Sequence, residues 1–111
     1  MALVPGRIYV ESTVRIPVNY EDASHADTDP DTVTFKLYSP SGVVSTYVYG
    51  TDAEINRSSV GDYYIDVVPT ESGRWFYRWV STGTFKASAV EGTFVVQASP
   101  FFDQITDAYR S

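Results

Sequence analysis

The sequence predicts an all-β fold, an antiparallel β-sandwich of about seven strands that ends in a short C-terminal helix or arm. Short runs of alternating apolar and polar residues recur along the chain, with turn residues about every 8–12 positions. Valine, threonine and aromatic residues, which favour strands, are abundant. Helical periodicity is absent before the last dozen residues. We therefore expect a sandwich domain over residues 1–98 and a separate arm or short helix over residues 99–111.

The segment 73–79, Gly-Arg-Trp-Phe-Tyr-Arg-Trp, holds both tryptophans of the chain. In a strand, the two tryptophans and Tyr77 share one face, and Phe76 and Arg78 lie on the other. The aromatic face is either a ligand platform for sugars or bases, or the centre of a packed core. Apolar alternation in the neighbouring segments favours the core. The predicted core anchors are Trp75, Tyr77, Trp79, Phe35 and Phe94.

The first strand is expected within residues 7–20, where most even positions are apolar. This segment forms one long half-buried strand, or two short strands that break near Ser12. Pro17 lacks an amide hydrogen, so we expect its side of the strand to lie at a sheet edge or at a switch between sheets.

A β-hairpin is predicted over residues 32–49. Residues 32–38 and 43–49 both alternate, and a Ser-Pro-Ser-Gly turn joins them. The remaining strands are expected at residues 53–57, 62–68, 74–81 and 85–97.

In the strand at residues 62–68, successive side chains point to opposite faces, so they form two sets. The set Tyr63, Ile65 and Val67 is the more apolar, and we expect it to face the core. The pattern Gly61-x-Tyr63 resembles the tyrosine corner of immunoglobulin-like sandwiches, in which the hydroxyl group bonds to upstream backbone.

An acidic loop is predicted at residues 21–31, which include no apolar residue larger than alanine. Asp27, Asp29 and Asp31 could supply oxygen ligands to a cation such as Ca²⁺. However, the glycine and the bidentate glutamate of a calcium-binding loop are missing, and Pro30 stiffens the spacing. The sequence therefore favours a solvated, mobile loop, with a cation site as the alternative.

Composition excludes several classes of function. The net charge of −6, with 14 acidic against 8 basic residues, argues against nucleic-acid binding and against anionic membranes. No cysteine is present, so disulfides and thiol chemistry are excluded. No apolar run approaches the roughly 18 residues of a membrane-spanning helix. Residues 1–7 lack the features of a secretory signal, so we expect synthesis and folding in the cytoplasm.

Catalytic motifs are missing as well. The sequence contains no glycine-rich phosphate loop, no Gly-x-Ser-x-Gly and no His-Glu-x-x-His. Its single histidine, His25, leaves little material for a catalytic triad or a histidine metal site. We expect no enzyme activity, no catalytic residue, no metal, no cofactor and no small-molecule substrate.

The C-terminal segment is a candidate partner contact. Ser99-Pro100 suits the start of a helix, and apolar residues follow at helix-like spacing. These residues are Phe101, Phe102, Ile105 and Tyr109. They pack either on their own domain or on another subunit, because exposed Phe-Phe pairs are rare on soluble proteins.

Four segments of the chain are informative when taken together. They are the turn at residues 39–42, Gly-Asp-Tyr-Tyr-Ile-Asp-Val at 61–67, the aromatic segment at 73–79 and Glu-Gly-Thr-Phe-Val-Val at 91–96. Together these segments resemble the small immunoglobulin-like structural proteins of tailed bacteriophages. The resemblance covers residues 32–97 and implies an immunoglobulin-like sandwich without catalytic residues.

The resemblance further implies a virion component of the neck, the head–tail connector or the capsid decoration. Such a protein is made in the host cytoplasm and becomes oligomeric in the assembled particle. We expect it to dock to capsid, portal or neck and tail proteins through edge strands and the C-terminal arm. The alternative is a carbohydrate-binding or protein-binding immunoglobulin-like module of a bacterial surface protein.

Overall fold

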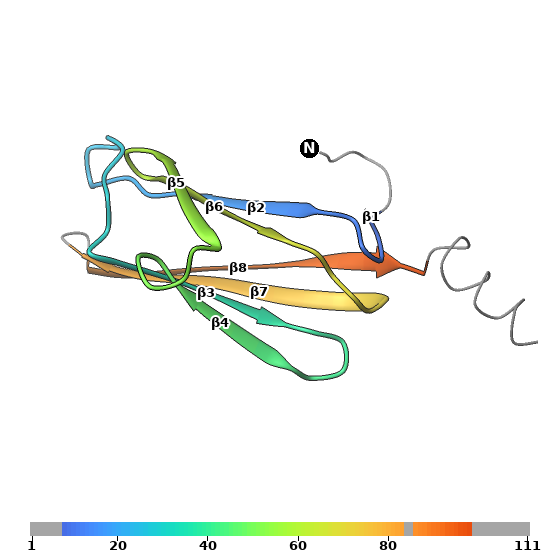
Figure 1. The fold of residues 1–111 in the computed structure, drawn as a ribbon. Helices are drawn as coiled ribbons and strands as arrows, with labels where there is room; N and C mark the ends of the chain where they lie inside the picture. Colours follow the sequence, from blue (N-terminus) through green and yellow to red (C-terminus); the bar gives the residue numbers. More distant parts are fainter. Residues whose placement is uncertain (1–7, 84–85, 99–111) are drawn as a thin grey trace, which may run out of the picture.

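The computed structural model describes residues 8–83 and 86–98 as two facing β-sheets (Figure 1). The eight strands are β1 (Ile8–Tyr9), β2 (Val14–Asn19), β3 (Thr32–Tyr38), β4 (Val44–Val48), β5 (Ile55–Ser59), β6 (Asp62–Val67), β7 (Gly73–Gly83) and β8 (Lys86–Gln97). This confirms the predicted all-β sandwich. The described part of the chain contains no helix that could cross a membrane.

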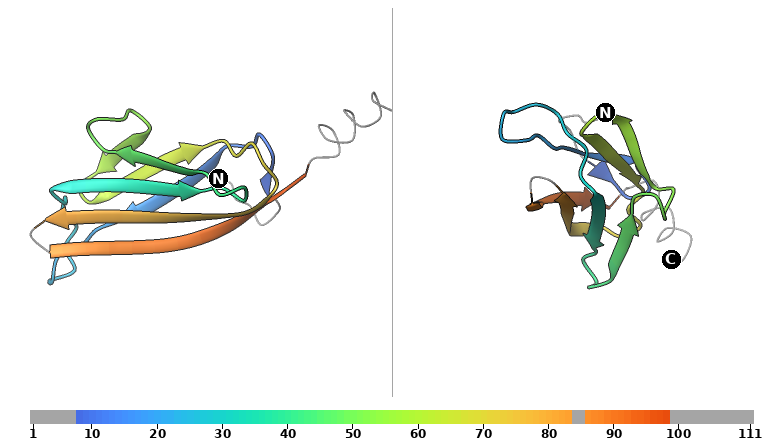
Figure 2. Two further views of the ribbon diagram at one scale, coloured as in Figure 1. Left: turned by 90° about the horizontal axis from the view of Figure 1, so that it is seen from below. Right: turned by 90° about the vertical axis from the view of Figure 1, so that its left-hand side faces the viewer.

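The strand order is that of an immunoglobulin-like sandwich (Figure 2). One sheet has five strands in the order β1-β8-β7-β3-β4, and the other has three in the order β2-β6-β5. All pairs are antiparallel except β1 with β8, which is parallel. The predicted C-terminal arm, residues 99–111, lies outside the described residues.

The segment at residues 7–20 forms two short strands, which confirms the second of the two predicted alternatives, and these strands belong to different sheets. The described residues therefore form eight strands, where we expected about seven. β1 pairs with β8 and β2 pairs with β6, so the chain changes sheet between Tyr9 and Val14. Glu11 adopts a positive φ of 73°, which interrupts the extended backbone. The amide of Glu11 donates to the carbonyl of Pro69 at 2.9 Å and holds the crossing in place. Pro17 lies on β2, an edge strand, where a missing amide hydrogen costs little.

The hairpin of β3 and β4 forms as predicted, with Phe35 opposite Tyr47. Its outer strand, β4, is an edge of the five-stranded sheet. At the end of β4, the Asp52 carboxylate accepts from the amide of Val48, and the Asp52 amide donates to the carbonyl of Val48, both at 2.8 Å. The outward backbone groups of β4 are therefore already bonded at this end.

The core lies between the sheets and is centred on β7. Trp79 and Phe35 are almost completely buried, at 1% and 0% exposure, and their ring centroids are 4.7 Å apart. Trp75 is buried as well, and its indole nitrogen donates to the carbonyl of Glu71 at 3.0 Å. The buried apolar residues are Ile16, Val18, Tyr20, Val33, Phe35, Leu37, Ile55, Tyr63, Ile65, Val67, Trp75, Trp79 and Val96.

The remaining predicted core anchors, Tyr77 and Phe94, are partly buried and pack against this cluster. Phe76, by contrast, lies on the opposite face of β7 and is 46% exposed. The structure therefore places the tryptophan face in the core and leaves no indole platform open to a ligand.

We predict that Trp79→Ala lowers the free energy of unfolding by about 3–5 kcal/mol, because a buried aromatic ring is lost and a cavity remains. Phe76→Ala, on the same strand but half exposed, should cost less than about 1 kcal/mol. Chemical denaturation of both variants measures the difference. Equal losses would show that β7 does not divide into a buried and an exposed face.

Candidate docking surface

The outer face of the five-stranded sheet is built from rows of side chains that cross the strands. Strand register aligns Val44, Tyr38 and Phe76 in one row. These three side chains are 58%, 47% and 46% exposed, and the Tyr38 and Phe76 ring centroids are 6.2 Å apart. Solvent-exposed aromatic pairs of this kind are unusual on a free surface and are typical of binding sites.

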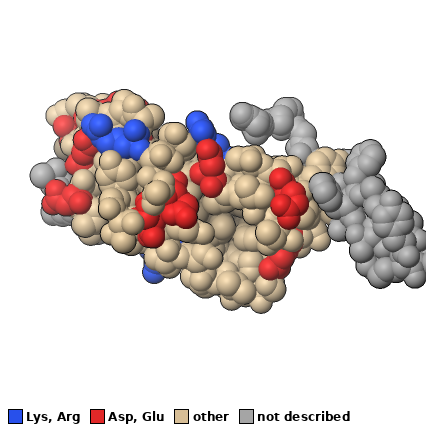
Figure 3. All heavy atoms as spheres, in the orientation of Figure 1, with Lys and Arg blue, Asp and Glu red and all other residues tan. Residues whose placement is uncertain are grey.

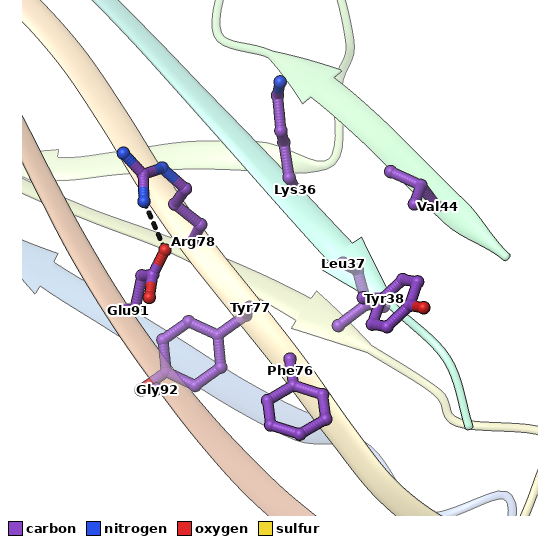
Figure 4. Close-up of a pocket in the computed structure, with 9 residues that line it drawn as sticks. All are labelled: Lys36, Leu37, Tyr38, Val44, Phe76, Tyr77, Arg78, Glu91 and Gly92. Atoms are coloured by element: carbon purple, nitrogen blue, oxygen red, sulfur yellow. Dashed lines mark hydrogen bonds and ion pairs between the residues drawn. The ribbon is translucent and has the colours of Figure 1, made fainter. Parts of the chain in front are cut away.

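The next row along the strands is charged. It contains Lys36 of β3, Arg78 of β7 and Glu91 of β8, which are aligned by the same register. Arg78 and Glu91 form an ion pair on the exposed face (Figure 4). An apolar row therefore lies directly beside a polar row, the arrangement of an interface with a hydrophobic centre and a charged rim.

A shallow groove of about 260 Å³ runs between the two rows. Besides the six side chains named above, Leu37, Tyr77 and Gly92 line it, and these three align in the register between the rows (Figure 4). Gly92 is required there because a Cβ at this position would lie 2.4 Å from Cζ of Tyr77. The Tyr77 ring therefore crosses β8 where that strand has no side chain.

Two cations on this face have no acidic partner. Among the side chains that the structure describes, Arg15, Arg57 and Arg78 each form an ion pair with a carboxylate. Lys36 and Arg74 form none, and Arg74 makes only a 3.5 Å contact with the hydroxyl of Thr93. Both belong to strands of the five-stranded sheet and alternate onto its outer face. The charge left uncompensated on this face is therefore positive, although the chain is acidic overall.

The edge of β8 is the second feature that a partner could use. β1 pairs with β8 only at Val96 and Gln97, so residues 88–95 have no strand on that side within the described ranges (Figure 2). Val90, beside this edge, is 44% exposed although it faces the same way as Trp79. An open strand edge offers backbone donors and acceptors to an added strand.

The acidic loop does not assemble a cation site. Within residues 8–83 and 86–98, no group of three or more acidic or histidine side chains is close enough to hold a metal ion. Asp27 accepts from the side-chain amide of Asn19 at 3.2 Å, whereas Asp29 points to the turn between β5 and β6. The loop is exposed, as predicted, but hydrogen bonds hold it: one carboxylate oxygen of Asp22 accepts from the amides of Ser24 and Ala26.

Asp29 is the anchor of this loop, a role that its sequence position did not indicate. Its carboxylate accepts two hydrogen bonds from Arg57, at 3.1 and 2.9 Å, one from the amide of Gly61 at 2.9 Å and one from the hydroxyl of Tyr63 at 3.0 Å. The Tyr63 hydroxyl thus bonds upstream to a side chain, and not to backbone as the tyrosine-corner resemblance suggested.

This arrangement shifts the titration of two groups. The Arg57 hydrogen bonds, followed by the Gly61 amide, lower the pKa of Asp29 to about 2. Burial, and then its hydrogen bond to Asp29, raises the pKa of Tyr63 to about 12. Both shifts favour the same state, an ionised aspartate that accepts from a neutral tyrosine.

Basic side chains are few on the face seen in Figure 3, and most of them lie against acidic neighbours. This view shows no basic stripe of the kind that binds nucleic acid. Among the side chains that the structure describes, the cations without an acidic partner are Lys36, which lines the groove, and Arg74, which lies one row beyond Phe76.

The groove residues are not those that the sequence predicted as partner contacts. The predicted partner contacts, Phe101, Phe102, Ile105 and Tyr109, fall outside the described residues. Of the groove residues, Phe76 was expected to face away from the tryptophans, whereas Tyr38 had no predicted role. The alignment of the two rings depends on the pairing of β3 with β7.

We predict that Asp29→Asn destabilises the fold at neutral pH. The folded-state pKa of Asp29 lies below its ordinary value of 3.8, so its contribution to stability is complete above about pH 4 and is lost as the pH falls towards 2. The stability difference between wild type and Asp29→Asn should therefore shrink over this window.

Unfolding by denaturant at several pH values measures this difference. Asp31→Asn is the matched control, because the Asp31 carboxylate forms no hydrogen bond or ion pair with any described residue. A difference for Asp29→Asn that stays constant from pH 6 to pH 2 would contradict the ion-pair anchor.

Comparisons with known proteins support the fold and leave the family open. No model of a known protein family matches the chain, and no curated protein matches it. Among solved structures, the chain is similar to part of the chitinase ChiW from Paenibacillus sp. str. FPU-7, described as a bacterial cell-surface-expressed multi-modular enzyme machinery. The TM-score is 0.61 at 18% identity, over 85% of this chain but only 8% of the chitinase. At this identity, the likeness shows a shared β-sandwich fold.

Proposed function

We propose that this chain is a non-enzymatic docking module that serves as a structural protein of a tailed-phage virion. The observation that carries the docking role is the exposed row of Val44, Tyr38 and Phe76 beside its groove. A sandwich of this size has no need to expose two aligned aromatic rings for its own stability, so a partner surface accounts for them best.

The virion setting is supported by the sequence segments that resemble small immunoglobulin-like phage proteins, which span residues 32–97. In that setting the partners are capsid, portal or neck and tail proteins, and the protein is oligomeric in the particle. The open edge of β8 is consistent with the expected use of edge strands, because a partner strand could extend the five-stranded sheet there.

The second candidate is a binding module of a bacterial surface protein, favoured by the likeness to part of a multi-modular cell-surface chitinase. In this case Tyr38 and Phe76 would contact a polysaccharide or a protein, with Lys36 and Arg78 as hydrogen-bond donors at the rim of the groove. The two candidates share the same surface and differ in its ligand.

We predict that a Tyr38→Ser/Phe76→Ser double variant enters phage particles at about one-tenth of the wild-type level or less, because central aromatic contacts carry much of the energy of an interface. Mass spectrometry of purified particles measures the copy number. Val60→Ser is the control, since Val60 is equally exposed, at 47%, but lies between β5 and β6 of the other sheet.

Wild-type protein that is absent from particles, but that binds insoluble polysaccharide and loses this binding in the double variant, would favour the surface module. Equal incorporation of the double variant and the wild type would remove the aromatic row from the docking role.

A further inference from the structure

We propose that the groove between the apolar and charged rows receives the C-terminal segment, residues 99–111, of a neighbouring copy of this chain. This inference rests on the proposed function as a self-assembling structural protein and names the contact between its subunits. The segment fits the groove in three properties, which are apolar character, charge and position.

The first property is apolar complementarity. The groove has one wall of Val44, Tyr38 and Phe76, all about half exposed. The segment supplies the apolar residues Phe101, Phe102, Ile105 and Tyr109, and Phe101 and Phe102 are adjacent in sequence. Aromatic rings on both sides can pack edge to face at 4.5–7 Å or so and exclude water from the centre of the contact.

The second property is charge. Lys36 lines the groove and Arg74 lies one row beyond Phe76, and neither has an acidic partner among the described side chains. The segment carries Asp103 and Asp107 between its apolar residues and Arg110 near its end, so two acidic side chains stand against one basic side chain. An acidic, aromatic segment therefore matches an apolar groove whose unpaired charges are positive, which favours association and opposes binding in the wrong orientation.

The third property is position. β8 ends at Gln97, one residue after the pair Val96–Gly73, and the segment begins two residues after Gln97. To reach its own groove, the segment would have to reverse at once and run back over the outer face of β8, from Gln97 to beyond Thr93. A chain that continues forward instead leaves its own sandwich, and 13 residues can extend over roughly 40 Å. That length suffices to cross the sheet of a neighbour.

The contact is directional, because it joins the end of one copy to the face of the next. Such heterologous contacts build closed rings or open chains, depending on the rotation between copies. This geometry is compatible with the ring symmetry of a neck or connector, and it leaves each copy with one groove and one segment in use.

The test uses the full-length chain in two variants that each damage one half of the contact. The groove variant is Tyr38→Ser/Phe76→Ser, and the segment variant is Phe101→Ser/Phe102→Ser. Sedimentation velocity should show concentration-dependent association of the wild type. For each variant alone, the association constant should be at most about one-tenth of the wild-type value. Thermal unfolding of each variant confirms that the sandwich is intact.

An equimolar mixture of the two variants provides the decisive measurement. The segment variant keeps an intact groove and the groove variant keeps an intact segment, so the mixture should form a heterodimer through one wild-type contact. Lys36→Asp should weaken association in the otherwise wild-type chain, and adding Asp103→Lys should restore it in part. Val60→Ser should associate as the wild type does.

Two results would overturn the proposal: a wild type that stays monomeric at all concentrations, and a mixture that forms no heterodimer. They include the case in which the segment binds the groove of its own copy. These outcomes are separate from the particle experiment, because a protein can enter particles through capsid or portal contacts without exchanging its C-terminal segment. Incorporation without heterodimer formation would leave the virion role and remove this contact.

Discussion

The contact between Trp79 and Phe35 is the interaction on which the rest of the structure depends. Both side chains are almost fully buried, and they come from neighbouring strands, β7 and β3, of the five-stranded sheet. Because successive side chains of a strand point to opposite faces, placing Trp79 inward forces Arg78 and Phe76 outward. The packing of the core therefore determines which residues form the outer surface, and the same two strands supply most of the groove.

The two sheets also differ in how their positive charges are compensated. On the three-stranded sheet the described cations are neutralised locally: Arg15 bonds Asp66 and lies 3.9 Å from the centre of the Tyr64 ring, and Arg57 bonds Asp29. On the five-stranded sheet, Lys36 and Arg74 form no ion pair with any carboxylate that the structure describes. Among the described side chains, the positive charges without an ionic partner therefore lie on the same sheet as the exposed aromatic rings.

Much of the fold could be predicted from alternation alone. Phe35 on β3 and the set Tyr63, Ile65 and Val67 on β6 are buried as expected, because one face of each strand must be apolar. The division of the first strand near Ser12 was one of two alternatives that the sequence left open. The choice between them depends on a positive φ at Glu11 and on a bond to Pro69, far along the chain.

The surface features were harder to predict than the core, because they depend on contacts between distant segments. Asp29 looked like one of three alternating aspartates, but its partners are 28 to 34 residues away. The pairing of Tyr38 with Phe76 likewise required the register of β3 against β7. A sequence pattern shows which way a side chain points, whereas its neighbours across the sheet follow only from the pairing.

The bonds between Asp52 and Val48 have a consequence for the behaviour of the protein at high concentration. In the antiparallel pattern of β4, the backbone groups of Val44, Thr46 and Val48 point away from β3. Asp52 occupies those of Val48, which leaves two residues of an uncharged, valine-rich edge for a new strand. So short an edge is a poor template for amyloid-like stacking. The β4 edge is therefore a poor starting point for fibril growth even at high protein concentration.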